Sequence, residues 1–193
     1  YLAEFVELAE KHSKKILIFF PGDSDEEVPV PYSIVFRNSQ YGYKKQENEI
    51  IMPGFAVDLG ATYGLEERAK GEKPVVGFCG WASYTTVREW ISYVMVNLVE
   101  SLVGERARKK GLYFRRQALA ILKKSDKVAT NFVIRTSYSG NAKTLTVDAK
   151  QARKEYVDNI KNLDFTLAPK GDGNFSVRFF ESLSLGRIPL LID

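Results

Sequence analysis

The residues best suited to chemistry lie in one short segment near the C-terminal end of the sequence, PKGDGNFSVRFFE. It contains two glycines, a serine, an arginine and a glutamate, in this order: Gly171, Gly173, Ser176, Arg178 and Glu181. Glycines let a main chain approach a phosphate closely, and the start of a helix offers unpaired N–H groups and a positive dipole end. An arginine forms paired charged hydrogen bonds with a diphosphate, and a carboxylate can accept hydrogen bonds from ribose hydroxyls. These types and this order indicate a nucleotide site.

A helix expected over 177–186 decides how these side chains point. At about 100° per residue, three apolar side chains share one face of it: Phe179, Phe180 and Leu183. We expect this face to pack on a sheet. Arg178 and Glu181 lie on the opposite side, where we expect both to point toward a cleft.

The other residues of the segment have supporting roles. Ser176 stands where it would cap the helix or bond a phosphate oxygen. Asp172 and Asn174 lie in the same loop and are included among the residues expected to contact the ligand. Lys170 fits a phosphate contact and a solvated lysine equally well. The alternatives without function are a glycine turn and a solvated ion pair between Arg178 and Glu181, which would stabilise the helix by about 0.2–0.5 kcal/mol.

Strands alternating with helices predict an α/β fold with parallel sheets. Strands are expected at 16–20, 33–39, 49–53, 75–80, 130–135, 164–169 and 188–192, and helices at 4–15, 85–103, 113–124, 151–162 and 177–186. A stretch rich in glycine and charge at 63–74 reads as a linker. We therefore expect two Rossmann-like units, an incomplete one at 1–70 and another at 71–193, each shorter than a complete domain. The chain begins at Tyr1 and stops after an apolar run, so we expect it to be part of a longer protein.

Composition excludes several classes of protein. One cysteine among 193 residues rules out a disulfide framework and a Cys-rich zinc site. One histidine leaves little material for histidine-based metal or triad chemistry, and we expect no metal site. No apolar run has the roughly 18–20 residues of a membrane span. The net charge of +4 is mild and the basic residues are scattered, which fits an anionic small ligand at least as well as nucleic acid.

Weaker signals lie elsewhere in the chain. Asp23-Ser24-Asp25 matches a D-x-D pattern that holds a metal-bound diphosphate, but a solvated acidic loop is the stronger interpretation. Arg135 and Trp81 lie at the ends of expected strands. Arg135 could face a cleft or lie on the surface, and Trp81 could stack on a base or sugar or serve in packing. Three more are expected to be inactive, namely a buried Cys79, an exposed His12 and the solvated basic helix face at 113–117.

The segment PKGDGNFSVRFFE, together with SLSLGRIPLLID that follows it, closely resembles the signature of exostosin-family glycosyltransferases. YVDNIKNLDFTLAP at 156–169 and KPVVGFCG with Arg88 resemble the family's approach to that signature and its opening strand and helix. The resemblance is specific over about 151–193, fair over 73–150 and weak before residue 70. It implies a two-domain B-type glycosyltransferase fold, in which 1–70 would be the incomplete acceptor-side unit and 71–193 the nucleotide-sugar-binding domain, truncated at its C-terminus. It further implies that the sugar is transferred from a nucleoside diphosphate-sugar with inversion of configuration at the anomeric carbon. It also implies that no metal is tightly bound and that no separate cofactor is used.

The resemblance assigns roles to residues of the segment. Gly171, Gly173 and Ser176 would contact the diphosphate, Arg178 would neutralise it, and Glu181 would hold the ribose. The acceptor would be a glycan or polysaccharide hydroxyl, with no nucleic acid partner and with membrane proximity only through missing segments. Bacterial relatives work in the cytoplasm, which we favour here, and animal and plant relatives work in the Golgi. The general base is not placed; Asp58 is a candidate, although a turn-forming aspartate is the stronger interpretation.

Two other function classes stay open. Gly171-x-Gly173-x-x-Ser176 approximates the G-x-G-x-x-G loop of NAD(P)-binding oxidoreductases, and Asp193 stands where a ribose-binding acid would follow. Against that class, Pro169 and Lys170 lengthen the turn, serine replaces the third glycine, and the loop comes last in the chain. A non-catalytic carbohydrate-binding module on the same fold is the third class.

Overall fold

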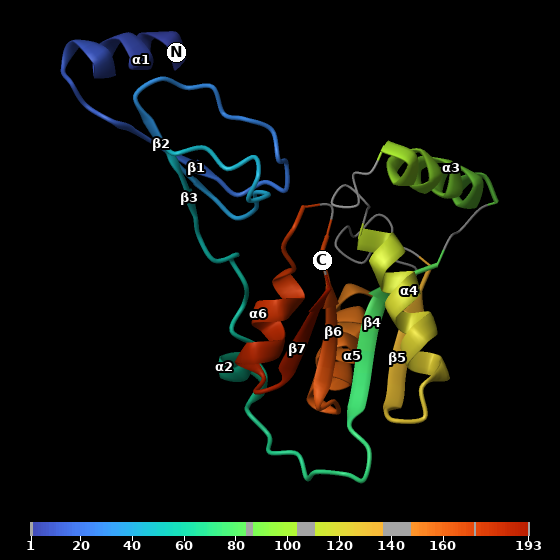
Figure 1. The fold of residues 1–193 in the computed structure, drawn as a ribbon. Helices are drawn as coiled ribbons and strands as arrows, with labels where there is room; N and C mark the ends of the chain where they lie inside the picture. The colour runs from blue at the N-terminus through green and yellow to red at the C-terminus, as the bar shows by residue number, and fades with distance from the viewer. Residues whose placement is uncertain (1, 84–86, 104–110, 137–147, 172, 193) are drawn as a thin grey trace. The chain divides into compact units, whose positions relative to one another are not determined.

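The computed structural model describes residues 2–83, 87–103, 111–136, 148–171 and 173–192, and it divides the chain into two units. The first unit consists of Tyr1–Phe55 and Gly171–Phe175, and the second of Ala56–Lys170 and Ser176–Asp193. Each unit contains a sheet of parallel strands with helices (Figure 1). The predicted α/β class with two separate parallel sheets is therefore confirmed. Residues 56–70, expected with the N-terminal part, are grouped with the second unit.

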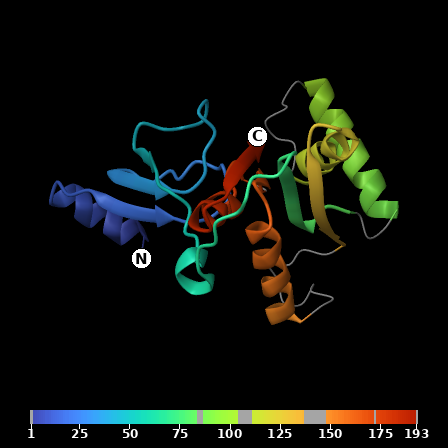
Figure 2. The ribbon, with the colours of Figure 1, turned by 90° about the horizontal axis from the view of Figure 1, so that it is seen from below.

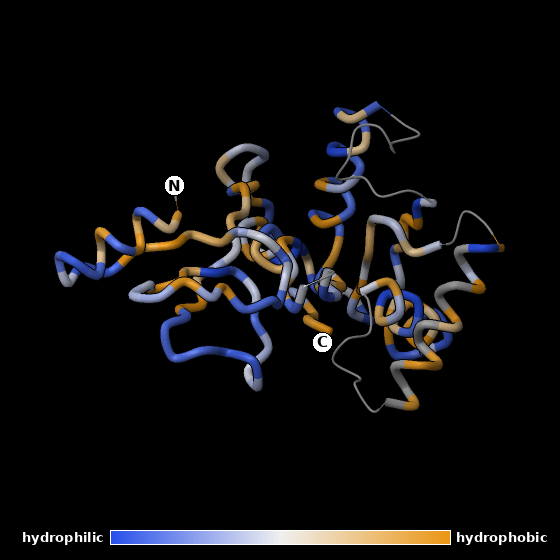
Figure 3. Tube along the Cα trace, turned by 90° about the horizontal axis from the view of Figure 1, so that it is seen from above, coloured by the Kyte–Doolittle hydropathy of each residue, from blue (hydrophilic) through white to orange (hydrophobic). Residues whose placement is uncertain are grey.

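The first unit is built on a three-stranded sheet in the order β1-β2-β3, with β1 at Ile16–Phe20, β2 at Ser33–Arg37 and β3 at Glu49–Ile51. Val35 of the central strand is fully buried, and the rings of Phe19 and Phe36 stack at 5.0 Å. Helix α1 (Leu2–Lys11) precedes the sheet, and polar and apolar residues alternate along it (Figure 3). It ends at Lys11 rather than at the expected residue 15.

A buried ion pair organises the carboxyl ends of this sheet. Arg37, at the end of β2, and Glu49, at the start of β3, are 0% and 3% exposed, and the guanidinium Nη1 lies 2.5 Å from the carboxylate. The same guanidinium donates to the main-chain oxygens of Ser24, Glu26 and Ser39. The loops that follow β1 and β2 are thus held by one side chain, which explains why β2 ends at Arg37 instead of the expected residue 39.

The second unit is built on a four-stranded parallel sheet in the order β5-β4-β6-β7. Its strands are β4 (Val75–Trp81), β5 (Ala129–Arg135), β6 (Phe165–Pro169) and β7 (Ile188–Ile192). Its helices are α2 (Leu59–Tyr63), α3 (Val87–Val103), α4 (Gly111–Lys124), α5 (Ala149–Lys161) and α6 (Val177–Ser184). All predicted strands and helices of this unit are found, with shifts of a few residues at their ends, whereas the short α2 was not expected.

Helices α4 and α5 lie on opposite faces of this sheet (Figures 1 and 2). On one face Phe78 and Leu167 pack against Ala118 and Leu119 of α4. A second buried cluster is formed by Leu59 of α2, Val157 and Ile160 of α5, and Leu185, which follows α6. Within the described ranges of the chain, no helix is both long enough and apolar enough to cross a membrane.

Gly77 in β4 allows the close packing of Leu163, which lies two residues after the end of α5. A Cβ atom at position 77 would lie 2.2 Å from a methyl group of Leu163, which is completely buried. Gly77→Ala is therefore expected to destabilise the protein by about 1–3 kcal/mol through overpacking. Gly71→Ala is the control, since its Cβ would meet the nearest atom at an ordinary 3.6 Å. Equal thermal midpoints for the two variants would refute this packing argument.

Candidate functional site

The strand order of the second unit places a topological switch point between β4 and β6. From β4 the chain runs through α3 and α4 to β5 on one side, and then returns through α5 to β6 on the other side. In open α/β sheets, ligands bind beyond the carboxyl ends of the strands at such a point. Here β4 ends at Trp81 and β6 at Pro169. The geometry at these two strand ends therefore decides what the site can do.

The Arg178 side chain spans these two strand ends. Its Nη2 donates to the main-chain oxygen of Cys79 in β4 at 2.8 Å, and its Nη1 lies 3.4 Å from the main-chain oxygen of Leu167 in β6. The guanidinium stacks on the ring of Phe78 at 4.4 Å. Its Nε is buried and has no hydrogen-bond partner among the described residues. No carboxylate in the described part of the chain forms an ion pair with Arg178, so the switch point carries a fixed positive charge.

Glu181 lies one turn further along α6 and is 7% exposed. Two residues of α5 hold its carboxylate: Arg153 donates to Oε1 at 2.9 Å, and the Tyr156 hydroxyl donates to Oε2 at 2.6 Å. The guanidinium groups of Arg153 and Arg178 lie 5.3 and 5.5 Å from the Tyr156 ring. Burial raises the pKa of Tyr156, and the nearby Glu181 carboxylate raises it further, so its hydroxyl remains a donor at neutral pH.

Local sequence explains how α5 delivers these groups. Asp148 caps the helix by accepting the N–H groups of Lys150 and Gln151. Ala152, Val157 and Ile160 are buried, which fixes the face that α5 turns to the rest of the unit. Arg153 and Tyr156, at helical spacing beside that face, are thereby directed at α6.

The predicted orientation of α6 is wrong. Leu183, expected on the packed face, is 52% exposed, and Phe179 and Phe180 are only partly buried. Glu181, Ser182 and the following Leu185 are buried instead. Charged residues can face inward here because Arg178 has carbonyl partners and Glu181 has Arg153 and Tyr156. Arg178 and Glu181 are therefore part of the packing of the second unit.

The other predicted site residues are divided between the two units. Ser176 occupies the N-cap position of α6, but its side chain makes no capping hydrogen bond. Gly171, Gly173 and Asn174 belong to the first unit, where the Asn174 amide group donates to the main-chain oxygen of Gln40 at 2.6 Å. A Cβ at Gly173 would lie 2.7 Å from the Ser39 hydroxyl, so packing accounts for this glycine. Asp172 and Asp193 lie outside the described residues.

Several weaker candidates also have structural roles. Lys170 is 1% exposed, with its ammonium 5.2 Å from the Phe114 ring, and is not the solvated lysine considered above. Arg135 pairs with Glu155 at 2.9 Å, and the Trp81 indole donates to the Ser83 main-chain oxygen at 2.6 Å. Cys79 is buried, and burial raises the pKa of its thiol.

The remaining candidates lie elsewhere. Asp58 caps α2 by accepting the Ala61 N–H at 3.0 Å, as a structural aspartate does. Asp25 of the D-x-D motif pairs with Lys44 at 2.6 Å, and His12 is exposed. In the basic segment at 113–117, Arg115 donates to the Trp81 main-chain oxygen at 3.2 Å. Among the residues that the structure describes, no three histidine, cysteine or acidic side chains gather as a metal site.

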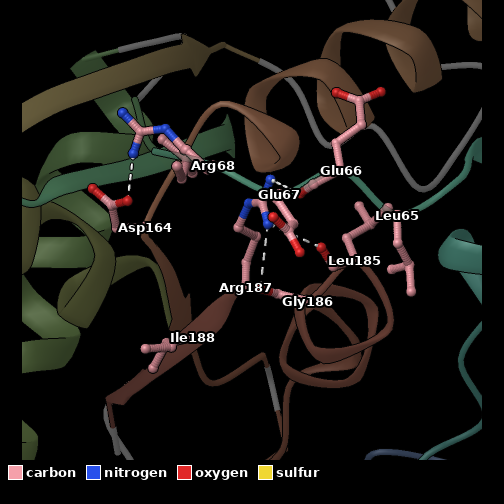
Figure 4. Close-up of a pocket in the computed structure, with 10 residues that line it drawn as sticks. Leu65, Glu66, Glu67, Arg68, Asp164, Leu185, Gly186, Arg187 and Ile188 are labelled. Atoms are coloured by element: carbon pink, nitrogen blue, oxygen red, sulfur yellow. Dashed lines mark hydrogen bonds and ion pairs between the residues drawn. The ribbon is translucent and has the colours of Figure 1, made fainter. Parts of the chain in front are cut away.

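A pocket lies near the amino ends of β6 and β7, at the opposite end of the strands from the switch point (Figure 4). Its walls include the main chain before β6 and β7 and the segment Leu65–Arg68. The charged side chains there serve the fold: Arg68 pairs with Asp164, and Arg187 donates to main-chain oxygens of Lys161 and Glu66. The Val75 N–H and Arg68 together lower the pKa of Asp164. This pocket faces the amino ends of the strands, where α/β sheets do not place their ligands.

Arg153 and Tyr156 are the site residues that sequence reasoning missed. Both lie on α5, which was expected as a helix with a strong polar face. Spacing alone gives no sign that another helix packs against part of that face. No protein-family model matches the chain, and no curated protein is similar to it.

Proposed function

We propose that the second unit binds a nucleoside diphosphate-sugar at the carboxyl ends of β4 and β6, and that the protein transfers the sugar to a glycan hydroxyl. This is the inverting reaction that the exostosin resemblance implies. The observation that carries the proposal is the fixed guanidinium of Arg178 at the switch point, with the Glu181 carboxylate one helical turn away.

The two charged groups fit the two ends of such a donor. A diphosphate gains negative charge as it leaves the sugar, and a fixed positive charge in a partly buried position stabilises it there. A carboxylate held by two donors still has lone pairs for the adjacent hydroxyls of a ribose. Arg178 is thus assigned to the diphosphate and Glu181 to the ribose.

Sugar transfer requires one bond to form and one to break. The acceptor oxygen bonds to the anomeric carbon, and the bond from that carbon to the diphosphate oxygen breaks. The electron pair leaves with the diphosphate, and the acceptor proton passes to a base. Asp58 is a weak choice for this base because it caps α2.

Turnover separates an enzyme from a non-catalytic binding module. The protein is incubated with UDP-sugars and GDP-sugars together with glycan acceptors, and free UDP or GDP is measured. Acceptor-dependent release supports transfer. Tight donor binding with no release would support the binding module instead, and hydride transfer to NAD would support the oxidoreductase.

Glu181→Gln is expected to weaken binding of UDP or GDP by about ten- to a hundredfold. An amide replaces a charged acceptor, and hydrogen bonds to a charged group contribute about 1.5–3 kcal/mol. Isothermal titration calorimetry measures the change, with Glu67→Gln as a control of equal charge change in the exposed segment after α2. Unchanged affinity in the Glu181 variant would show that this carboxylate does not bind the ribose.

A further inference from the structure

The orientation of the Glu181 carboxylate is set by α5 rather than by its own helix. Both carboxylate oxygens accept hydrogen bonds from α5 residues, one from Arg153 and one from Tyr156. Arg153 keeps 37% of its side chain exposed, so water can replace it. The hydrogen bond from the Tyr156 hydroxyl is the shorter of the two, at 2.6 Å, and its donor is attached to a rigid ring.

The Tyr156 ring itself has little freedom. Guanidinium groups lie near it from two helices, Arg153 from α5 and Arg178 from α6, at 5.3 and 5.5 Å. Such cation–π contacts fix a ring more strongly when they are shielded from water. Because Arg178 is tied to the ends of β4 and β6, the ring is positioned relative to the sheet. The hydrogen bond from the Tyr156 hydroxyl therefore fixes the position of the Glu181 carboxylate.

We propose that Tyr156 is the positioning residue that directs the Glu181 carboxylate at the 2′ and 3′ hydroxyls of a nucleoside diphosphate. The inference rests on the proposed function, because it assumes that Glu181 binds the ribose. Tyr156 does not touch the ligand. It holds Oε2 so that the other lone pairs of the carboxylate face the two hydroxyls. Burial and the adjacent carboxylate keep its hydroxyl protonated and donating.

The test combines Tyr156→Phe with removal of the ribose hydroxyls from the ligand. Calorimetric affinities are measured for UDP and GDP and for their 2′,3′-dideoxy forms, with wild-type protein and the variant. Phenylalanine keeps the ring beside the two guanidinium groups, so the variant should fold, and its thermal midpoint checks this. The expected result is an affinity for UDP or GDP about tenfold lower than wild type, with the dideoxy affinities unchanged.

Tyr32→Phe is a matched control, since Tyr32 also donates to a glutamate, Glu10, at 3.0 Å but lies in the first unit. It should bind every ligand as wild type does. Equal losses for the normal and dideoxy forms in Tyr156→Phe would overturn the proposal and leave only a packing role. So would an unchanged affinity for both. If wild-type protein does not prefer the normal ligands over the dideoxy forms, the failure lies in the proposed ribose site.

Discussion

Replacing Arg178 by glutamine is expected to slow sugar transfer about 100- to 1000-fold, the cost of removing one fixed group that stabilises charge in a transition state. Glutamine is uncharged and shorter, so it lacks both the positive charge for the departing diphosphate and the Nη2 donor that reaches the Cys79 main-chain oxygen. The loss should fall mainly on kcat, because this charge matters most when the diphosphate leaves. Initial rates over a range of donor concentrations measure the effect.

Arg116→Gln provides the matched control for this variant. Arg116 is an exposed arginine of α4 whose Nη1 lies 3.4 Å from the Ala82 main-chain oxygen, just beyond the end of β4. The Arg116 variant therefore loses the same charge and a comparable contact near the same strand end, but from an exposed side chain of α4 instead of a guanidinium stacked on Phe78. Similar rates for both variants would show that the charge of Arg178 has no special role in transfer.

Glu49→Gln is expected to destabilise the first unit by about 3–5 kcal/mol, because it leaves the buried guanidinium of Arg37 without its counter-charge. Hydrogen exchange of amides in β1 and β2 measures this, with β4 of the second unit as an internal reference. Glu47→Gln, at an exposed neighbouring position, should change nothing. Normal protection of β1 and β2 in Glu49→Gln would contradict a stabilising role for the ion pair.

The same carboxylate gives a pH dependence of known sign. Burial acts to raise the pKa of Glu49, but hydrogen bonds from the Gln46 N–H and from Arg37 outweigh it, and the pKa lies below its ordinary value. The charged form therefore stabilises the fold above the unfolded value of about 4.3, and this contribution is lost as pH falls through the lower folded value. Wild type and Glu49→Gln should converge in stability at acid pH.

Much of the fold could be predicted because local pattern determines it. Apolar runs such as 16–20 and 188–192 match β1 and β7 residue for residue. Gly186, with a φ of +67°, follows the end of α6 as a helix-terminating glycine does. The short α2 was missed because its five residues show no helical repeat.

The candidate site was predicted less well, since it depends on contacts between elements. Helical periodicity places the aromatic residues of α6 inside and its charged residues outside. The partners that make the opposite arrangement stable, Arg153 and Tyr156, lie 25 or more residues away in the chain. A buried glutamate becomes predictable only when the packing of α5 against α6 is known.

The most direct test of the central claim is a calorimetric titration of the protein with UDP, GDP and NAD, in wild-type and Arg178→Gln forms. The account predicts that wild-type protein binds UDP or GDP and not NAD, and that Arg178→Gln binds the same diphosphate at least about tenfold more weakly. Binding of NAD in preference to both diphosphates, or equal binding of UDP and GDP by the two forms of the protein, would contradict it.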